Sequence, residues 1–354
     1  MDNNIIPLFS FGIATFVVGF IMIPFFIDLL IKFKMGKQIR SEATIGKATE
    51  FEKLHKKKKG TPTMGGFIII FIVFLMVIAS IILQELGFIR NSLLNQRETY
   101  LSLFTLLSVG GLGLIDDYLN IKGVGKTKGL SARVKMFGLI LFATLGAFWF
   151  YYKLGWNVVD GMGNYVRTLN NPFGDNISIG LYFIPLFIFI IIATSNSVNL
   201  TDGLDGLAGG LLLFSYSVYA YITYDQGLFL LSTLCISIIG ALAAFLWFNV
   251  KPAKFYMGDV GSLALGANLG IMAMITNTVF ILIIIGAIFI LETLSVIIQL
   301  ISKKFRNGKK IFRIAPYHHH LEAIGWSEEN VVFRLWLIGM LFSVIGIIFY
   351  IIQG

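Results

Sequence analysis

The sequence is short of charge and of cysteine. Only 13% of its 354 residues are charged and 56% are hydrophobic, whereas soluble domains carry about 25% charged residues. The single cysteine, Cys235, cannot form a disulfide within the chain. These shortages exclude an ordinary soluble enzyme, a disordered chain and a domain held by disulfides. They leave a membrane protein that crosses the bilayer several times.

Long apolar runs take up most of the chain. A helix that crosses a bilayer needs about 20 largely apolar residues. Ten runs are near this length, at residues 5–31, 64–86, 100–119, 134–152, 180–199, 205–222, 227–247, 261–276, 279–301 and 330–352. The sequence therefore predicts an all-α polytopic membrane protein of about ten transmembrane helices, which we expect to form one domain over residues 1–354.

The net charge of +9 is concentrated in a few loops. Of the 28 Lys and Arg residues, 23 fall within or beside the loops at 32–59, 116–135, 248–260 and 302–329, and four lie in loops on the other side. Loops on the cytoplasmic side of a membrane carry the excess of Lys and Arg. We therefore expect these four loops in the cytoplasm and both termini outside.

Four consecutive lysines, at 56–59, precede a small glycine-rich segment at 60–66 that includes Thr63. The backbone N–H groups of such a segment can point at an anion where a helix begins. Lysines beside it supply charge for a phosphate. Contact of the lysines with anionic lipids explains the same pattern, so both interpretations stay open.

Carboxylates gather at the span ends on the same basic face. Three clusters hold them: Asp116 with Asp117, then Asn199 with Asp202 and Asp205, and finally Asp259. The spacing of three in the second cluster places its side chains on one arc if the helix continues that far, although its glycines also allow a polar loop. A single Asp at a helix end is more often a cap than a ligand. Three such clusters beside basic loops favour Mg²⁺, which commonly shares oxygen ligands with substrate phosphates.

Glu292 lies inside the ninth apolar run. A charged residue within a span is expected to be functional. The alternative is a structural partner for a buried Lys, Arg or hydroxyl group. Gln299 lies two turns further on, on the same broad face and nearer the cytoplasm.

Three of the four histidines are consecutive, at His318, His319 and His320. Adjacent His side chains rarely converge on one zinc ion, and no cysteine accompanies them. We expect hydrogen bonding to a phosphate or sugar, or proton transfer near neutral pH. For at least one of the three, a solvated turn is the alternative.

Together these motifs resemble one family of membrane enzymes. The resemblance rests on Lys-Gly-Thr-Pro-Thr-Met-Gly-Gly at 59–66, Asp-Asp-Tyr at 116–118, the polar stretch at 195–209, Met-Gly-Asp-Val-Gly-Ser at 257–262 and Ala-Pro-Tyr-His-His-His at 315–320. The chain is similar to the bacterial phospho-N-acetylmuramoyl-pentapeptide transferases. The paired Asp and the Gly-Asp-Val-Gly-Ser also occur in the wider superfamily of polyprenyl-phosphate hexosamine-phosphate transferases, whereas Thr-Pro-Thr-Met-Gly-Gly and the triple His favour this branch.

The resemblance implies a reaction at the cytoplasmic face of the bacterial cytoplasmic membrane. Undecaprenyl phosphate would attack the β-phosphate of UDP-N-acetylmuramoyl-pentapeptide, which gives lipid I and UMP with Mg²⁺ as cofactor. It also suggests a homodimer and no nucleic-acid partner. Direct attack and a covalent intermediate on an Asp both fit. We favour direct attack because a phosphate anion is already a competent nucleophile.

The resemblance also assigns roles to individual residues. Asp259 would be the leading Mg²⁺ ligand, and Asp116 and Asp117 would either assist the metal or deprotonate and orient the lipid phosphate. The nucleotide pocket would be formed by Lys58, Thr63, Asn199, Asp202, Asp205, Asn249, Tyr256 and Gln299. His318, which we also count as catalytic, and His319 would contact the nucleotide or sugar phosphate, and Glu292 and His320 complete the expected substrate-binding set. Charge and position alone add Lys126 and Lys135 as phosphate-binding candidates.

Two other functions compete with this one. The nearer is a transferase of N-acetylglucosamine phosphate for teichoic acid or surface polysaccharide. The other is a transporter, supported by the ten spans and Glu292. Against a transporter, the sequence has no inverted repeat and its polar residues cluster on one face instead of crossing the midplane.

Overall fold

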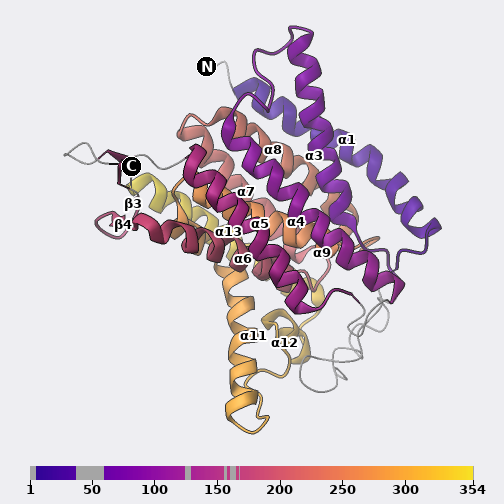
Figure 1. The fold of residues 1–354 in the computed structure, drawn as a ribbon. Coiled ribbons are helices and arrows are strands. Elements are labelled where there is room, and N and C mark those ends of the chain that lie inside the picture. The colour runs from indigo at the N-terminus through magenta and orange to yellow at the C-terminus, as the bar shows by residue number, and fades with distance from the viewer. Residues whose placement is uncertain are drawn as a thin grey trace.

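Long helices follow the apolar runs of the sequence closely (Figure 1). The structure is a computed structural model that describes residues 5–36, 60–123, 129–154, 158–159, 165–166 and 168–353. Its membrane-length helices are α1 (Ile5–Lys32), α3 (Gly65–Glu85), α4 (Arg97–Lys122), α5 (Ala132–Trp149), α6 (Phe183–Thr201), α7 (Leu207–Asp225), α8 (Phe229–Asn249), α9 (Gly258–Ile275) and α13 (Glu328–Gln353). Nine helices of the described residues are long and apolar enough to cross a membrane, or ten if one bent pair counts as a span. The expected polytopic helical fold is confirmed.

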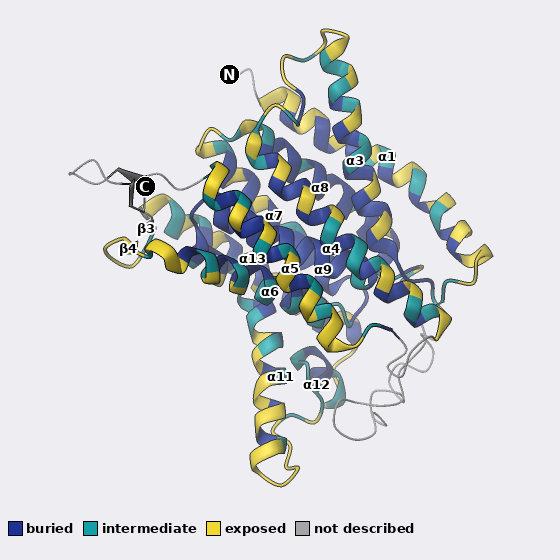
Figure 2. Ribbon diagram, viewed as in Figure 1, coloured by how far each residue is buried: buried dark blue, intermediate teal, exposed yellow. Residues whose placement is uncertain are grey.

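Helix α9 forms the centre of the bundle, packed against α3, α4, α6, α7 and α10. All of its residues are buried except Asp259, which is partly exposed (Figure 2). Small residues permit this close packing, as they do in membrane bundles generally. A Cβ atom on Gly66 of α3 would lie 2.0 Å from the Cα atom of Gly261, and one on Gly113 of α4 would lie 2.4 Å from the carbonyl oxygen of Asp259. The glycines at these crossings therefore bring α3 and α4 against the start of α9.

The run at 279–301 is not the single straight helix that its hydropathy suggests. It divides into α10 (Val279–Ile285) and α11 (Ala287–Phe305), whose axes differ by 78°. The break falls at Gly286, whose N–H still bonds to the carbonyl oxygen of Leu282. Helix α11 projects from the bundle beside the short helix α12 (Tyr317–Ala323). The bend thus carries the polar face of α11, with Glu292 and Gln299, to α12.

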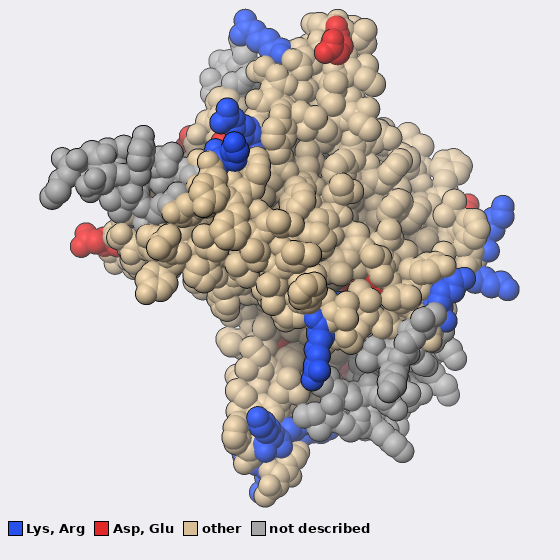
Figure 3. All heavy atoms as spheres, viewed as in Figure 1, with Lys and Arg blue, Asp and Glu red and all other residues tan. Residues whose placement is uncertain are grey.

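The two ends of the bundle differ in structure. One, here called the hairpin end, carries two short β-hairpins between α5 and α6. They pair β1 (Val158–Val159) with β2 (Tyr165–Val166), and β3 (Thr168–Leu169) with β4 (Ile177–Ser178). The other, here called the α12 end, holds the end of α4, the start of α9 and α12. Figure 3 shows a largely uncharged surface across the middle of the molecule, with basic side chains at the right and bottom of the view and others at the upper left.

Candidate active site

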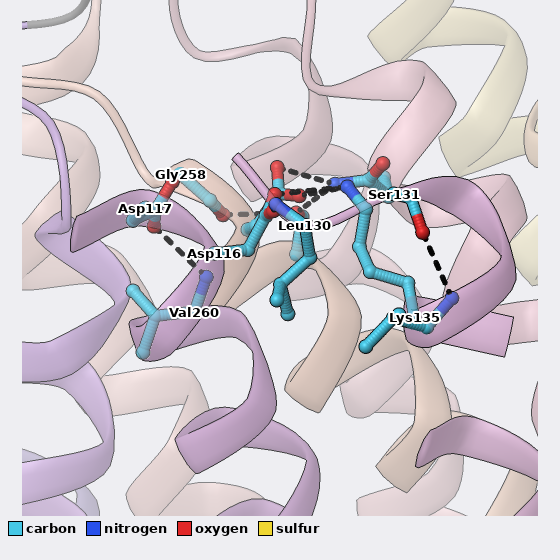
Figure 4. Close-up of polar contacts among 11 residues, drawn as sticks. Asp116, Asp117, Leu130, Ser131, Lys135, Gly258 and Val260 are labelled. Carbon is cyan, nitrogen blue, oxygen red and sulfur yellow. Dashed lines mark hydrogen bonds and ion pairs between the residues drawn. The ribbon is translucent and has the colours of Figure 1, made fainter. Parts of the chain in front are cut away.

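A lysine and two aspartates from three helices meet at the α12 end. Asp116 lies near the end of α4, Lys135 in the first turns of α5 and Asp259 at the start of α9. The ammonium Nζ of Lys135 lies 2.9 Å from Oδ2 of Asp116 and 2.8 Å from Oδ2 of Asp259 (Figure 4). We call these three residues the carboxylate–lysine cluster. The structure thus joins two residues expected to bind metal to a lysine expected to bind phosphate.

Asp117 has a different partner from its neighbour. Its Oδ2 accepts a hydrogen bond of 3.1 Å from the backbone N–H of Val260 and so caps the first turn of α9. Gly258, with φ of 74°, sits beside this contact. A Cβ atom there would lie 2.4 Å from Oδ2 of Asp117 and 2.9 Å from Oγ1 of Thr63. The glycine therefore lets α9 begin directly against Asp117 and Thr63.

Asn199 orients Asp259 from the end of α6. Its Nδ2 donates to Oδ1 of Asp259 at 3.0 Å and to Oγ of Ser262 at 2.9 Å. Sequence reasoning missed Ser262, although it belongs to the Gly-Asp-Val-Gly-Ser motif that was singled out. A carboxylate held by a fixed amide keeps one orientation, which is what binding of a cation requires.

Helix α6 ends at Thr201, so the arc expected for Asn199, Asp202 and Asp205 does not form. Asp202 lies at the C-cap, half-buried, while Asp205 lies in the turn before α7. The Oδ2 of Asp205 accepts from the N–H of Ala253, and its own N–H donates to Glu328. The glycine-rich polar loop, which was the other interpretation of this segment, is what the structure has.

The glycine-rich segment at 60–66 does not direct its last N–H groups at an anion. Gly65 and Gly66 donate to the carbonyl oxygens of Tyr256 and Met257, both at 2.7 Å. Tyr256 in turn donates to the carbonyl oxygen of Pro62 at 2.8 Å. This ladder fixes Thr63, which is 1% exposed, and the half-buried Tyr256 next to Asp259. The hydroxyl of Thr63 has no hydrogen-bond partner among the described residues.

Two side-chain amides expected in the nucleotide pocket brace loops at the α12 end. Asn249 accepts from the N–H of Gly206 and donates to the carbonyl oxygen of Phe255. Gln299 accepts from the N–H groups of Ile311 and Phe312 and also donates to the carbonyl oxygen of Phe312. Because both are almost fully buried, these contacts set the shape of the loops on which the other candidates sit.

Glu292 and His318 form a fully buried pair. The Oε2 of Glu292 lies 3.0 Å from Nδ1 of the His318 ring and accepts a 3.2 Å hydrogen bond from the His318 backbone. Both side chains are 0% exposed. Glu292 therefore has a buried partner, as its alternative explanation expected, but that partner is a histidine and not a Lys, Arg or hydroxyl group. The pair is positioned to fix the ring of His318.

The free edge of His318 faces the α6–α7 turn. Its Nε2 has no hydrogen-bond partner among the described residues. A Cβ atom on Gly203 would lie 2.2 Å from it, and 3.1 Å from Nε2 of His319. His319 contacts Glu322 at 2.7 Å, and Nδ1 of His320 accepts from the N–H of Arg313. The first two histidines thus lie against the polar loop, whereas the third contacts the segment before α12.

A second basic residue, Lys251, ties the C-terminal helix to this end of the bundle. It pairs with Glu328 at 3.4 Å and Glu329 at 2.8 Å. Burial opposes the charged form of Lys251, but the hydrogen bond to Glu329 and the charge of Glu328 outweigh it and raise the pKa of Lys251 above its ordinary value. Lys58 and Lys126 lie outside the described residues.

The donor set of the carboxylate–lysine cluster fits Mg²⁺. This ion typically takes one or two carboxylates and completes its shell with water and substrate phosphates. Asp116 and Asp259 supply two carboxylates that already share a cation, the ammonium of Lys135. Within the part of the chain that the structure describes, no three His, Cys, Asp or Glu side chains group as a metal site. The fit is therefore to two carboxylates, and the metal role of Asp117 stays a prediction.

Known proteins match this chain along nearly its whole length. The family model for glycosyl transferase family 4 matches residues 99–277. A phospho-N-acetylmuramoyl-pentapeptide-transferase of Geobacillus sp. (strain WCH70) is 40% identical over 336 residues, which cover 95% of both chains. The chain belongs to the phospho-N-acetylmuramoyl-pentapeptide-transferase family. Relatives of the same name from Anoxybacillus flavithermus and Listeria monocytogenes are each 38% identical and cover 98% and 95% of this chain, and 98% and 97% of their own lengths.

The two comparisons cover different parts of the site. The residues matched by the family 4 model include Asp116, Asp117, Lys135, Asn199 and Asp259. The buried Glu292–His318 pair and the segment at 60–66 lie beyond that match, but within the region shared with the phospho-N-acetylmuramoyl-pentapeptide-transferases, which spans about the whole chain. The site therefore combines residues within the family 4 match with residues that lie before and after it in the chain.

Proposed function

We propose that this membrane protein transfers phospho-N-acetylmuramoyl-pentapeptide from UDP-N-acetylmuramoyl-pentapeptide to undecaprenyl phosphate, a step of peptidoglycan synthesis. An oxygen of the lipid phosphate forms a bond to the β-phosphorus of the nucleotide. The bond from that phosphorus to the UMP oxygen breaks, and the products are lipid I and UMP. The observation that carries the proposal is the carboxylate–lysine cluster at one end of a bundle whose full-length relatives bear this enzyme name.

The geometry at the α12 end suits phosphoryl transfer, which depends mainly on positioning and on neutralising charge. Asp116 and Asp259 are the residues that would hold Mg²⁺. When bound, this ion neutralises phosphate charge in the transition state. Asn199 fixes the orientation of the Asp259 carboxylate. Asp117 accepts a hydrogen bond from the first turn of α9, which carries Asp259. Lys135 carries the one ammonium that contacts both carboxylates among the described residues.

We assign nucleotide binding to residues of the segment at 60–66 and of the loop before α9. Thr63 offers a buried hydroxyl with no protein partner in the described residues. Tyr256, half-buried beside it, presents an aromatic ring on which uracil can stack. Asp202 and His318, whose Nε2 faces Gly203 of the α6–α7 turn, would be further contacts of the nucleotide. Asn249, Asp205 and Gln299 act on the nucleotide through the loops that they brace.

We further propose that the α12 end faces the cytoplasm of a bacterium and that the protein acts as a homodimer. The excess of Lys and Arg in the loops of this end supports the orientation. A soluble nucleotide and a lipid phosphate must meet at a membrane surface, which agrees with a site at the helix ends. The dimer rests on family resemblance.

The donor sugar tests the proposed function against the nearest rival. Purified protein in detergent is given undecaprenyl phosphate and Mg²⁺ with either UDP-N-acetylmuramoyl-pentapeptide or UDP-N-acetylglucosamine, and UMP is measured. We expect UMP from the first donor alone. Release from the second donor alone would make the protein an N-acetylglucosamine-phosphate transferase. Asp259→Asn, which keeps the shape of the side chain but not its charge, serves as the inactive control.

A further inference from the structure

The ammonium of Lys135 occupies a position between two carboxylates where a metal ion would also be stable. It lies within 2.9 Å of an oxygen from each carboxylate, and those oxygens come from different helices. The cluster is not sealed, because the side chains of Lys135 and Asp259 are 22% and 21% exposed. Two negative charges and one positive charge leave the cluster with a net charge of −1, so it still attracts a cation.

The remaining contacts of the carboxylates are with donors that cannot move far. The other oxygen of Asp116 accepts from the backbone N–H of Leu130. The other oxygen of Asp259 accepts from the side chain of Asn199, which is also bonded to Ser262. Lys135 is different, because its ammonium ends a flexible four-carbon stem. Of these partners it has the longest and most flexible side chain, whereas Leu130 donates from the backbone and Asn199 is also held by Ser262.

We propose that Lys135 is a resident cation that competes with the divalent metal for Asp116 and Asp259 and moves to the substrate diphosphate when the metal binds. This rests on the metal site of the proposed function and adds a role for the lysine. Asp116 and Asp259 would exchange the ammonium for a divalent cation, and a phosphate brought with the donor would give Lys135 a new anionic partner. Lysine suits this exchange because it binds phosphate as a point charge.

The exchange has a structural alternative with the opposite consequence. If Lys135 only joins α4, α5 and α9, its removal loosens the carboxylates and weakens metal binding. If it competes, its removal leaves two fixed carboxylates without a cation and strengthens metal binding. The sign of the change in metal affinity therefore separates the two roles.

Binding of Mn²⁺ to the full purified chain, measured by electron paramagnetic resonance without nucleotide or lipid, gives this sign. We expect Lys135→Met and Lys135→Gln to bind Mn²⁺ at least tenfold more tightly than the wild type. Lys135→Arg, which keeps the charge, is expected to bind no more tightly than the wild type. Arg133 is an exposed residue of α5, two positions before Lys135. Arg133→Gln is therefore the matched control and should leave the affinity for Mn²⁺ unchanged. Unchanged or weaker binding by both neutral Lys135 variants overturns the proposal.

Chemical labelling of the wild-type chain gives a second readout that needs no variant. Amines are acetylated with and without Mg²⁺, and the modification of each lysine is followed by mass spectrometry. We expect Mg²⁺ to raise the labelling rate of Lys135 several-fold, because the ammonium is released from the carboxylates. Lys251, which is paired with Glu328 and Glu329, is the internal control and should not respond. Equal or slower labelling of Lys135 with Mg²⁺ contradicts the exchange.

Failure of this inference and failure of the proposed function have different signatures. Mn²⁺ binding and lysine labelling use neither the nucleotide nor the lipid, so they report on Lys135 whatever sugar the protein transfers. UMP release reports on the reaction whether or not Lys135 leaves the carboxylates.

Discussion

Asp117 caps a helix to which it does not belong. Its oxygen accepts from the N–H of Val260, which is buried at the start of α9. A buried N–H left without a partner costs about 1–3 kcal/mol. We predict that Asp117→Ala lowers the melting temperature of the purified protein, whereas Asp117→Asn, which can still accept the bond, lowers it much less. Equal losses in the two variants would show that the negative charge, not the hydrogen bond, is what stabilises α9.

The paired aspartates show how far sequence reasoning reaches at the residue scale. The motif identified Asp116 and Asp117 together as metal or phosphate residues. Neighbours on a helix point about 100° apart, so one side chain faces Lys135 and the other faces Val260. Residue types and spacing cannot choose between them, because the choice depends on where α5 and α9 pack. Lys135 was likewise expected from charge and position alone, and its carboxylate partners are set by the packing of α4, α5 and α9.

Glu292 is predicted to act on the reaction through His318. Its carboxylate is the partner of both the ring and the backbone of that residue. Loss of a hydrogen bond to a charged group costs about 1.5–3 kcal/mol, or roughly 10–100-fold in rate if the ring must be held for reaction. We expect this fall in kcat for Glu292→Ala, measured by UMP release, and a smaller fall for Glu292→Gln. Full activity of Glu292→Ala would show that the reaction does not depend on the contact between Glu292 and His318.

At the scale of elements, the crossing of α4 and α9 sets the position of Asp259. Gly113→Ala would place a Cβ atom 2.4 Å from the carbonyl oxygen of Asp259, and such overpacking costs about 1–3 kcal/mol. We predict that this variant loses UMP release and Mn²⁺ binding together. Gly111→Ala, two residues earlier on the same helix, meets nothing within 4 Å and should keep both. If the two variants behave alike, close packing at Gly113 does not position the site.

The elements themselves could be predicted from the sequence more fully than their geometry. Apolar runs located all the long helices to within a few residues, since a membrane span is set by length and hydropathy. The 78° break at Gly286 was not predicted. Hydropathy stays high through Ile284, Ile285 and Ala287, and the break is a backbone feature that a hydropathy pattern does not register. The bend matters because α11 carries Glu292 and Gln299.

At the scale of the whole molecule, the two ends of the bundle are predicted to face opposite sides of the membrane. The native Cys235 is fully buried, so added cysteines can be labelled on a silent background. Asp175→Cys at the hairpin end should react with a membrane-impermeant maleimide on intact cells. Lys309→Cys at the α12 end should react only after the membrane is opened. The reverse pattern would place the candidate active site outside the cell.

Direct transfer from the nucleotide to the lipid at one site can be measured with purified protein. The protein is given Mg²⁺ and UDP-N-acetylmuramoyl-pentapeptide labelled at the β-phosphate, with and without undecaprenyl phosphate. We expect equal amounts of UMP and of label extracted with the lipid when undecaprenyl phosphate is present, and neither without it. Release of UMP without the lipid, with the label bound to the protein at Asp116, Asp117 or Asp259, would contradict direct transfer.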